Sequence, residues 1–199
     1  MSLFDFDSKI CNGLAACGVD EAGRGPLAGP VYAAAVILTQ GCVIKGLNDS
    51  KKLTGKKREA LFLEITENAA DYAIASVTAV EIDEINILNA SMLAMRKAVG
   101  MLKSKPGIIL VDGNSDPGFG SPAELIVKGD AKSACIAAAS VLAKVSRDRH
   151  MLKLHEEYPG YRFDKHKGYG TKLHYEALCA HGPCPEHRES FLKKWRAAV

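Results

Sequence analysis

The sequence of 199 residues contains no long apolar run, no closely paired cysteines and no internal repeat. Because a membrane helix needs roughly 20 consecutive apolar residues, the chain offers no candidate for one. Its acidic start, Met-Ser-Leu-Phe-Asp-Phe-Asp, lacks the basic and apolar regions of a signal peptide. We therefore expect a cytoplasmic protein with reduced thiols and no membrane contact.

The six cysteines are scattered, and none belongs to a CxxC pair. Only Cys179, His181 and Cys184 approach the spacing of a zinc site, and no second cysteine pair lies near them in the sequence. This scarcity argues against a disulfide framework and against a structural zinc site. Whether these three residues bind anything is left open by the sequence.

The charge is unevenly distributed, although 47% hydrophobic and 25% charged residues are typical of a globular protein of one domain. The net charge is +3. From Lys144 onward the chain has twelve Lys and Arg, seven Asp and Glu, and all six histidines, whereas the earlier part has fourteen basic and sixteen acidic residues. Such asymmetry suits a protein that binds a cation with one part and a phosphate chain with the other, or else a solvated basic helical face.

Two adjacent carboxylates followed by a glycine-rich turn form the most informative stretch of the chain. Asp20 and Glu21 end a short apolar segment, and carboxylates this close repel each other unless a cation neutralises them. In the Gly23-Arg24-Gly25 turn, glycine lets backbone N–H groups approach a ligand and arginine suits phosphate. Because successive strand side chains point to opposite faces, the two carboxylates are expected to share a site only if the chain turns at Glu21.

The hydrophobic pattern predicts a mixed α/β sheet. Three early strands are expected to pair in antiparallel fashion, at 18–21, 31–38 and, briefly, 42–44. The later elements are a helix capped by Thr54, a strand at 72–80, one long helix with an apolar stripe from Leu88 to Leu102, strands at 108–111 and 123–127, an alanine-rich helix at 131–155, and helices through 178 and near 191–195.

Two further aspartates, Asp112 and Asp130, each follow an apolar strand. They are therefore expected at the carboxyl edge of the sheet, where ligands bind in open α/β folds. Together with Asp20 and Glu21 they could hold two Mg²⁺ or Mn²⁺ ions, since oxygen ligands favour these metals over zinc. The alternative is that a strand-end aspartate only caps a helix, which suits Asp130 best.

These motifs resemble the bacterial ribonuclease HII family. The resemblance extends in order through nearly the whole chain, and its segments are Asp20-Glu-Ala-Gly-Arg-Gly-Pro-Leu-Ala-Gly-Pro30, Asp49-Ser-Lys-Lys-Leu53, Asp112-Gly113, Lys128-Gly-Asp130, Ser140-Val-Leu-Ala-Lys-Val-Ser-Arg-Asp148 and His166-Lys-Gly-Tyr-Gly-Thr171. The related ribonuclease HIII is disfavoured, because only about 17 residues precede the first motif and an extra N-terminal domain does not fit there.

The resemblance implies a ribonuclease H-like, mixed five-stranded sheet flanked by helices, with a helical C-terminal extension. We expect a short leader at 1–16, a catalytic domain at 17–155 and a basic extension at 156–199 that contributes to substrate binding. The implied activity is two-metal hydrolysis, with Mn²⁺ or Mg²⁺, of RNA in RNA–DNA hybrids and on the 5′ side of ribonucleotides embedded in duplex DNA. The products would carry 3′-hydroxyl and 5′-phosphate ends, and the enzyme is expected to be a monomer.

The same resemblance implies roles for individual residues. Asp20, Glu21, Asp112 and Asp130 would be the catalytic, metal-binding carboxylates. Gly23, Arg24 and Gly25 would recognise the 2′-hydroxyl, which distinguishes RNA from DNA, and Tyr169 would stack on the sugar.

Other substrate contacts are predicted only from the positions of the residues in the sequence. Ser50, Lys51 and Lys52 are candidates for phosphate contacts, with an ordinary exposed loop as the alternative. Lys144 and Arg147 are candidates too, but their spacing from Asp148 equally predicts a local ion pair. We expect His166 to face solvent or, less simply, to shuttle a proton, and Trp195 to anchor the core.

Two other classes of function compete with a nuclease. A metal-dependent phosphatase acting on small molecules could use the same carboxylates but has little use for the basic C-terminal third. A non-catalytic nucleic-acid-binding module would leave four carboxylates repelling the phosphate chain unless metal is present.

Overall fold

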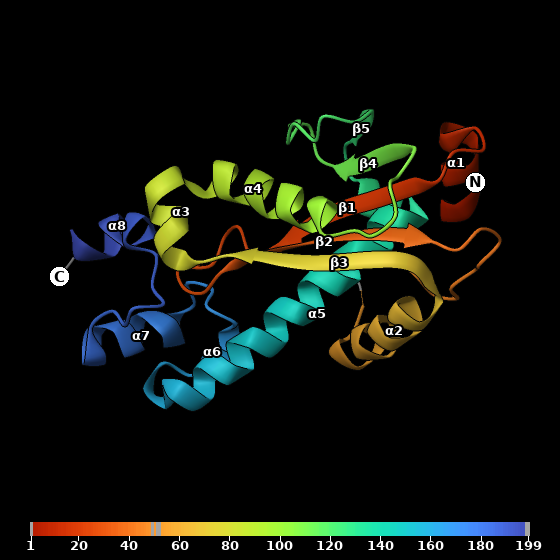
Figure 1. The fold of residues 1–199 in the computed structure, drawn as a ribbon. Helices are drawn as coiled ribbons and strands as arrows, with labels where there is room; N and C mark the ends of the chain where they lie inside the picture. Colours follow the sequence, from red (N-terminus) through yellow and green to blue (C-terminus); the bar gives the residue numbers. More distant parts are fainter. Residues whose placement is uncertain (1, 49, 51–52, 198–199) are drawn as a thin grey trace.

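A five-stranded sheet forms the centre of the computed structural model, which describes residues 2–48, 50 and 53–197 (Figure 1). Its order is β3-β2-β1-β4-β5. Strand β1 pairs antiparallel with β2 and parallel with β4, while β2 and β3 pair antiparallel and β4 and β5 parallel. The strands are β1 (Ala16–Ala22), β2 (Val31–Leu38), β3 (Ala69–Val77), β4 (Ile108–Asp112) and β5 (Ala123–Ile126). The predicted mixed sheet, with its antiparallel start, is confirmed.

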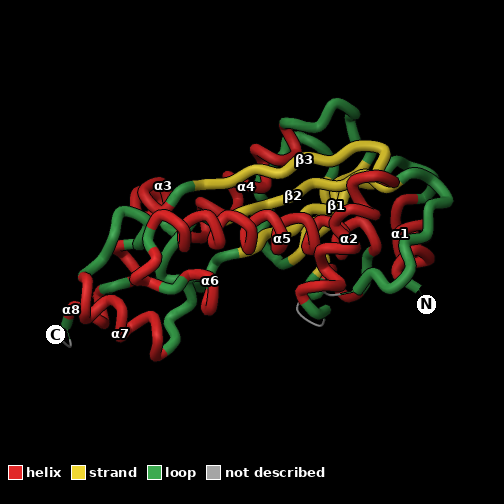
Figure 2. Tube along the Cα trace, turned by 90° about the horizontal axis from the view of Figure 1, so that it is seen from below, coloured by secondary structure: helices red, strands yellow, loops and turns green. Residues whose placement is uncertain are grey.

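Helices cover both faces of this sheet. Helix α4 (Ile87–Gly100) lies on one face and α2 (Gly55–Asn68) and α5 (Ala134–Glu157) on the other, as Figures 1 and 2 show from two directions. Two apolar cores result, one between the sheet and α4 and one between the sheet, α2 and α5. The side chains of β1 point alternately to the two cores. Those of Cys17 and Val19 lie in the core between the sheet and α4.

Small residues let α5 approach β1 closely. A Cβ atom at Gly18 would lie only 2.0 Å from the backbone carbon of Cys135 on α5, so no larger residue fits there. The alanines from Ala137 to Ala139 are fully buried against the sheet. This contact places the middle of α5 beside the end of β1, where the candidate carboxylates lie.

The C-terminal segments pack around the far end of α5. They are a 3₁₀ turn at Pro159–Tyr161, α6 (Phe163–His166), α7 (Lys172–His181), a 3₁₀ turn at Glu189–Phe191 and α8 (Lys193–Arg196). Their apolar cluster includes Met151, Phe163 and Leu178, with Trp195 half-buried against it as predicted, and also Leu27 and Ala28 from the glycine-rich stretch. At the other end of the sheet, α1 (Leu3–Cys11) is capped reciprocally by Ser2 and Asp5.

One predicted strand is absent, another has shifted bounds, and one predicted helix is divided. Residues 42–44 form no strand, and the predicted strand at 72–80 ends at Val77. The single helix after it is two helices, α3 (Ala79–Ile85) and α4. They are separated at Asn86, whose φ of +66° no helix can continue. On α4, Leu88 of the predicted stripe is exposed, whereas Met95 is buried in the core together with Ala90, Ala94 and Ala98.

Helix α5 begins three residues later than predicted, with Ser133 as its N-cap. The cap of α2 is Thr54, as the sequence predicts. Within the described residues, no helix has the length and apolar character needed to cross a membrane.

Candidate active site

The ends of two neighbouring parallel strands bring Asp20 and Asp112 together. The register pairs Val19 of β1 with Val111 of β4, so the next residue on each strand is an aspartate. In parallel strands of equal phase these two residues lie side by side at the carboxyl edge. The convergence predicted for this edge is therefore what the sheet topology produces.

The environment of Asp20 disfavours a charged carboxylate. Its side chain is buried, and one carboxylate oxygen, Oδ1, accepts a hydrogen bond from the N–H of Glu21 at 2.7 Å. Burial, and then the charges of Glu21 and Asp112, raise the pKa of Asp20 well above its ordinary value. A carboxyl group in this position is protonated or needs a cation beside it.

Glu21 reaches the same site without the turn that the sequence argument required. Strand β1 continues through Ala22, and Glu21 still pairs with Ala33 of β2. The pairing with β4 has already ended at Val19, so that side of β1 is open beyond this point. Both carboxylates line one cavity there. A contact at 3.5 Å joins Glu21 Oε1 to Arg24.

Asp112 and Asp130 are joined through a tight turn. Asp112 ends β4, and its Oδ1 accepts a hydrogen bond from the N–H of Gly129 at 2.6 Å. Asp130 follows in the 3₁₀ turn Gly129–Ala131 and is buried, at 6% exposure. The alternative prediction that Asp130 caps the next helix is wrong, because Ser133 does so by accepting from the N–H of Ile136.

The chemistry of these groups fits a hard divalent cation. They offer only oxygen atoms, and the buried Asp20 is crowded by two other carboxylates. In the present rotamers Asp20 and Asp112 accept from backbone N–H groups. Among the described residues, no three His, Cys, Asp or Glu side chains are grouped closely enough to hold one ion.

A cavity of about 230 Å³ lies beside Asp20 and Glu21. It collects most of the residues that the sequence singled out, and its lining consists of Asp20, Glu21, Ala22, Gly23, Arg24, Gly25, Ser50, Ser140, Lys144, Arg147 and Tyr169. Asp112 and Asp130 are not in this lining. Lys51 and Lys52 lie outside the described residues. Larger and more open hollows along α7 and β3 are lined by one acidic residue each, which is too few for a metal site.

The turn at Gly23 requires glycine. Its φ is +103°, and a Cβ there would lie 2.2 Å from Nε of Arg147. Arg147 is itself buried and donates to the carbonyl oxygens of Ala28, Pro30 and Lys167 at 3.0–3.1 Å. The sequence makes Arg147 a candidate for a phosphate contact or a local ion pair, whereas the structure shows its guanidinium bonded to backbone carbonyl groups beneath this turn.

Two other predicted contacts form hydrogen bonds within the protein. Lys144 pairs with Asp148 at 2.5 Å, which is the local ion pair that the spacing offered as an alternative. Ser50 is buried, and its hydroxyl lies 2.8 Å from that of Ser140 on α5. Both serines line the cavity on the same side as Asp20, so Ser50 is not part of an ordinary exposed loop.

A pair of buried histidines supports the loop that carries Tyr169. Tyr169 is 44% exposed at the cavity. Its carbonyl oxygen lies 3.0 Å from Nδ1 of His174, and Nε2 of His174 lies 3.0 Å from Nε2 of His187. The N–H of Cys184 donates to Nδ1 of His187. These partners fix the tautomers: His187 donates from Nε2 to His174, and His174 donates from Nδ1 to Tyr169.

His166 is neither solvent-exposed nor free to shuttle a proton, so both expectations for it are wrong. It is buried, its Nδ1 accepts from the N–H of Gly168, and its Nε2 donates to the carbonyl oxygen of Tyr161. Its ring stacks on that of His174, with centroids 4.4 Å apart. The residue therefore stabilises the Tyr169 loop.

Sequence reasoning missed several residues that shape this site. They are Ser140, His174, His187 and Arg188. Ser140 lies inside α5 and His174 inside α7, whereas His187 and Arg188 lie in an irregular segment. The local sequence pattern does not indicate the burial of any of the four, and that burial was the signal needed to find them.

The sheet order, the flanking helices and the carboxylates at the ends of β1 and β4 define a protein of the ribonuclease H-like class. A solved structure titled ribonuclease H2, from Pyrococcus horikoshii OT3, matches with a TM-score of 0.75 at 31% identity, covering 92% of this chain and 97% of that one. Bst-RNase HIII in complex with Mn²⁺ matches with a TM-score of 0.72 at 18% identity, covering 93% of this chain and 69% of that one, which shows the shared fold.

The family is narrower than the fold. The family model described as Ribonuclease HII matches residues 17–196. A ribonuclease HII from Idiomarina loihiensis is 63% identical over 175 residues, which make up 88% of this chain and 94% of that protein. The chain belongs to the ribonuclease HII family.

Proposed function

We propose that this chain is a divalent-metal-dependent endoribonuclease that hydrolyses the RNA strand of RNA–DNA hybrids. It also cleaves duplex DNA on the 5′ side of an embedded ribonucleotide and leaves 3′-hydroxyl and 5′-phosphate ends. Membership of the ribonuclease HII family supports the reaction class. The single observation that carries the assignment of the site is the register of β1 and β4, which sets Asp20 beside Asp112 at an open strand edge.

Asp20, Glu21, Asp112 and Asp130 are the residues that would hold the metal ions. Bound Mn²⁺ or Mg²⁺ would activate a water molecule and stabilise the leaving oxygen of the phosphodiester. The protein's part would be to hold these four carboxylates near one another although they repel each other. The ends of β1 and β4 would support Asp20 and Asp112 in this role, and the turn at Gly129 would support Asp130.

The Gly23-Arg24-Gly25 turn and Tyr169 would recognise the ribonucleotide. Both line the cavity next to Asp20 and Glu21, and the chain at Gly25 lies close to the Tyr169 ring. A cavity of about 230 Å³ suits a sugar and its phosphate rather than a whole duplex. Lys144 lines the same cavity and would contact phosphate, as would Ser50, Lys51 and Lys52.

The competing classes explain fewer of these features. A phosphatase for small molecules needs no exposed tyrosine above a glycine turn that is supported by the C-terminal segments. A passive nucleic-acid-binding module does not account for a buried, crowded carboxylate such as Asp20. We propose further that the enzyme acts in the cytoplasm as a monomer and that residues 156–199 contribute to duplex binding.

The test is the variant Asp20→Asn, which keeps the size of the side chain and removes its charge. We expect it to abolish cleavage of a duplex that contains one ribonucleotide, in Mg²⁺ and in Mn²⁺, while binding to the duplex is retained. Cleavage is measured on a labelled strand, which also shows the position of the cut and the end groups.

Two controls make the result specific. An all-DNA duplex of the same sequence must stay intact with the unaltered enzyme, and Glu67→Gln, at an exposed position near the end of α2, must leave cleavage unchanged. Retained cleavage by Asp20→Asn would remove Asp20 from the reaction and would contradict the proposed site.

A further inference from the structure

The guanidinium group of Arg188 is fully buried beneath the glycine-rich turn. It makes five hydrogen bonds, all to backbone carbonyl oxygens of residues 23–29. They join Nε to Gly29 at 2.9 Å, Nη1 to Arg24 and Pro26 at 2.9 Å each, and Nη2 to Gly23 at 2.6 Å and Gly29 at 2.8 Å. A guanidinium has five N–H donors, so all of them are used on one turn.

The direction of these carbonyl groups fixes the direction of the neighbouring amides. In a trans peptide, the C=O of one residue and the N–H of the next point in opposite directions. Because the carbonyls of Gly23 and Arg24 point inward to Arg188, the N–H groups of Arg24 and Gly25 point away from it. Gly23, Arg24 and Gly25 themselves line the cavity. Within the described part of the chain, neither N–H donates to another group.

The same arrangement ties the turn to the Tyr169 loop. The carbonyl of Pro26 faces Arg188, and the N–H of the next residue, Leu27, donates to the carbonyl oxygen of Gly168 at 2.8 Å. The N–H of Arg188 itself donates to the carbonyl oxygen of Leu27. Arg188 therefore sets the position of the turn relative to the tyrosine on the other side of the cavity.

No other side chain can replace this function. Lysine has three donors from one atom and cannot reach four carbonyls spread around a planar fork. The irregular segment from Glu186 to Arg188 also pairs with the turn through its backbone, since the N–H of Gly29 donates to the carbonyl oxygen of Glu186. The turn, which lies early in the chain, is thus held in place by residues near the C-terminus.

We propose that Arg188 is a positioning residue that sets the specificity of this enzyme for a ribonucleotide, because it aims the N–H groups of Arg24 and Gly25 at the sugar. It does not touch the substrate. The inference rests on the proposed function, in which this turn recognises the 2′-hydroxyl.

The experiment compares Arg188→Lys with the unaltered protein and with Met95→Ala, a buried residue of the α4 core on the opposite face of the sheet. We expect Arg188→Lys to lower kcat/KM on a duplex with one ribonucleotide by about tenfold to a hundredfold. Its dissociation constant for the all-DNA duplex should change by about twofold or less, since no phosphate contact is lost. Met95→Ala should lower thermal stability and leave both values near those of the unaltered enzyme.

Hydrogen exchange of backbone amides provides a measurement that does not depend on catalysis. Exchange at Leu27 and Gly29 should become faster in Arg188→Lys, while the amides of β1 and β2 stay protected. If Arg188→Lys does not fold, Arg188→Ala is examined with added methylguanidinium, which should restore both slow exchange and cleavage by filling the vacated site.

The outcomes separate the two proposals. Unchanged exchange in Arg188→Lys, unchanged selectivity, or equal losses in cleavage and all-DNA binding would each overturn the role of Arg188, as would failure of methylguanidinium to restore Arg188→Ala. If instead the unaltered enzyme does not prefer the ribonucleotide, or Asp20→Asn still cleaves, the proposed function fails while exchange still shows whether Arg188 holds the turn.

Discussion

At the scale of single residues, the two glycines around Arg24 have different tasks. Gly23 is buried with a φ of +103°, and any Cβ there collides with the side chain of Arg147. Gly25 is exposed at the cavity, and a Cβ there would meet only Cε1 of Tyr169, at 3.7 Å. The fold requires the first glycine, whereas the second has room for a methyl group beside the Tyr169 ring.

This difference predicts opposite behaviour for two alanine variants. Gly25→Ala should fold with nearly unchanged stability but lower kcat/KM on the duplex with one ribonucleotide, on the order of tenfold or more, because a methyl group enters the space between turn and tyrosine. Gly23→Ala should lose roughly 2–4 kcal/mol of stability through backbone strain and overpacking.

Urea unfolding and the cleavage assay measure the two effects separately. The matched control is Gly55→Ala at the start of α2, where a Cβ meets nothing within 4 Å. Full activity of Gly25→Ala would show that the substrate does not enter the space beside Tyr169.

Residue types predicted the acidic part of the site better than the basic part. Two adjacent carboxylates and two strand-end aspartates are unusual enough in a sequence to suggest a metal site. The sequence around Arg147, His166 and Arg188 does not indicate that their side chains are buried. Their burial depends on contacts between residues far apart in the chain, for example those of Arg188 with Gly23 and Gly29.

At the scale of elements, Asn86 decides that α3 and α4 are separate helices. Its φ is +66°, and its Oδ1 accepts hydrogen bonds from the N–H groups of Leu88 and Asn89 at 3.0 and 3.1 Å. Hydrophobic spacing alone predicts one helix here. The apolar pattern continues across the break, and only the asparagine, with its φ of +66° and ψ of 163°, distinguishes the two cases.

We expect Asn86→Ala to destabilise the protein by roughly 2 kcal/mol, because it loses the N-cap and keeps the unfavourable backbone conformation. Asn86→Gly should cost about 1 kcal/mol less than Asn86→Ala, since glycine adopts a positive φ without strain. Chemical denaturation of both variants gives the comparison. Equal losses would show that the cap alone matters at this position.

The loop that carries Tyr169 depends on neutral histidines. Burial, more than any other factor, lowers the pKa of His174 from 6.5 to about 4, and burial also lowers the pKa values of His166 and His187. In the unfolded chain each of them takes up a proton near pH 6.5. The stability that neutral His174 provides is therefore complete above pH 6.5 and is lost as the pH falls toward about 4.

For His174 alone this loss amounts to about 3 kcal/mol at most. The variant His174→Asn keeps a donor near the carbonyl of Tyr169 but does not titrate. It should be less stable than the unaltered protein near pH 7.5, and the difference should shrink as the pH approaches 4. Urea unfolding of both proteins at a series of pH values measures this difference. The titration of the carboxyl groups affects both proteins equally and therefore cancels in the difference. A constant difference would show that folding does not lower the pKa of His174.

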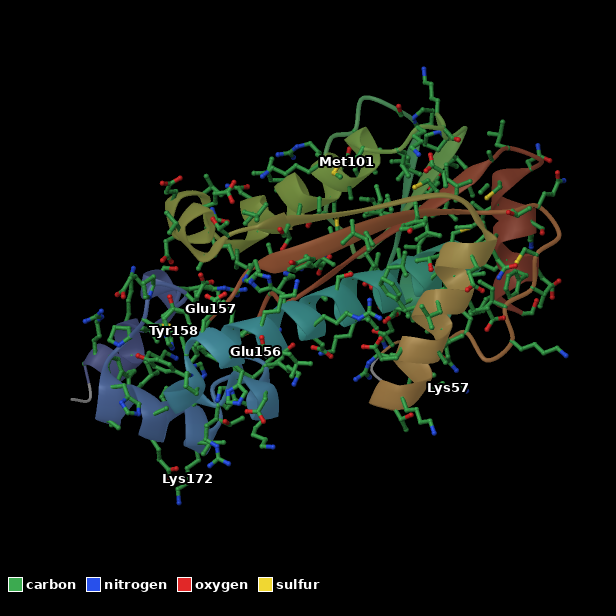
Figure 3. All side chains as sticks on the ribbon, turned by 60° about the horizontal axis from the view of Figure 1, so that its bottom comes forward. Lys57, Met101, Glu156, Glu157, Tyr158 and Lys172 are labelled. Carbon is green, nitrogen blue, oxygen red and sulfur yellow. The ribbon has the colours of Figure 1, made fainter. Side chains whose placement is uncertain are left out.

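At the scale of the whole molecule, the count of charges describes the surface poorly. Of the twelve basic residues after position 143, Arg147 and Arg188 are buried against carbonyl groups, and Lys144 and Arg196 are paired with carboxylates. Figure 3 shows Glu156 and Glu157 at the end of α5, while Lys172 extends outward from α7. The basic C-terminal third therefore supplies less free charge than its composition indicates.

The mixed α/β sheet with helices beside it follows from strong local patterns in the sequence, namely apolar strands and long amphipathic or alanine-rich helices. Local patterns do not reveal that residues 156–199 pack against the glycine-rich turn. That packing rests on an apolar cluster shared by Leu27, Ala28, Met151 and Leu192, and on the hydrogen bonds of Arg188. Such contacts link residues more than a hundred positions apart.

The crowded carboxylates predict that divalent metal stabilises the whole molecule. An ion that binds only the folded state contributes about 1.4 kcal/mol at tenfold excess over its dissociation constant, which corresponds to roughly 3–5 °C in Tm for a domain of this size. Thermal unfolding with and without Mg²⁺ or Mn²⁺, at constant ionic strength, measures the shift. Asp20→Asn should start from a higher Tm without metal, because its neutral amide relieves the repulsion from Glu21 and Asp112, and should gain little when metal is added. An equal gain in both proteins would place the stabilising ion elsewhere, and no gain in the unaltered protein would mean that the four carboxylates gather around metal only when the substrate is bound.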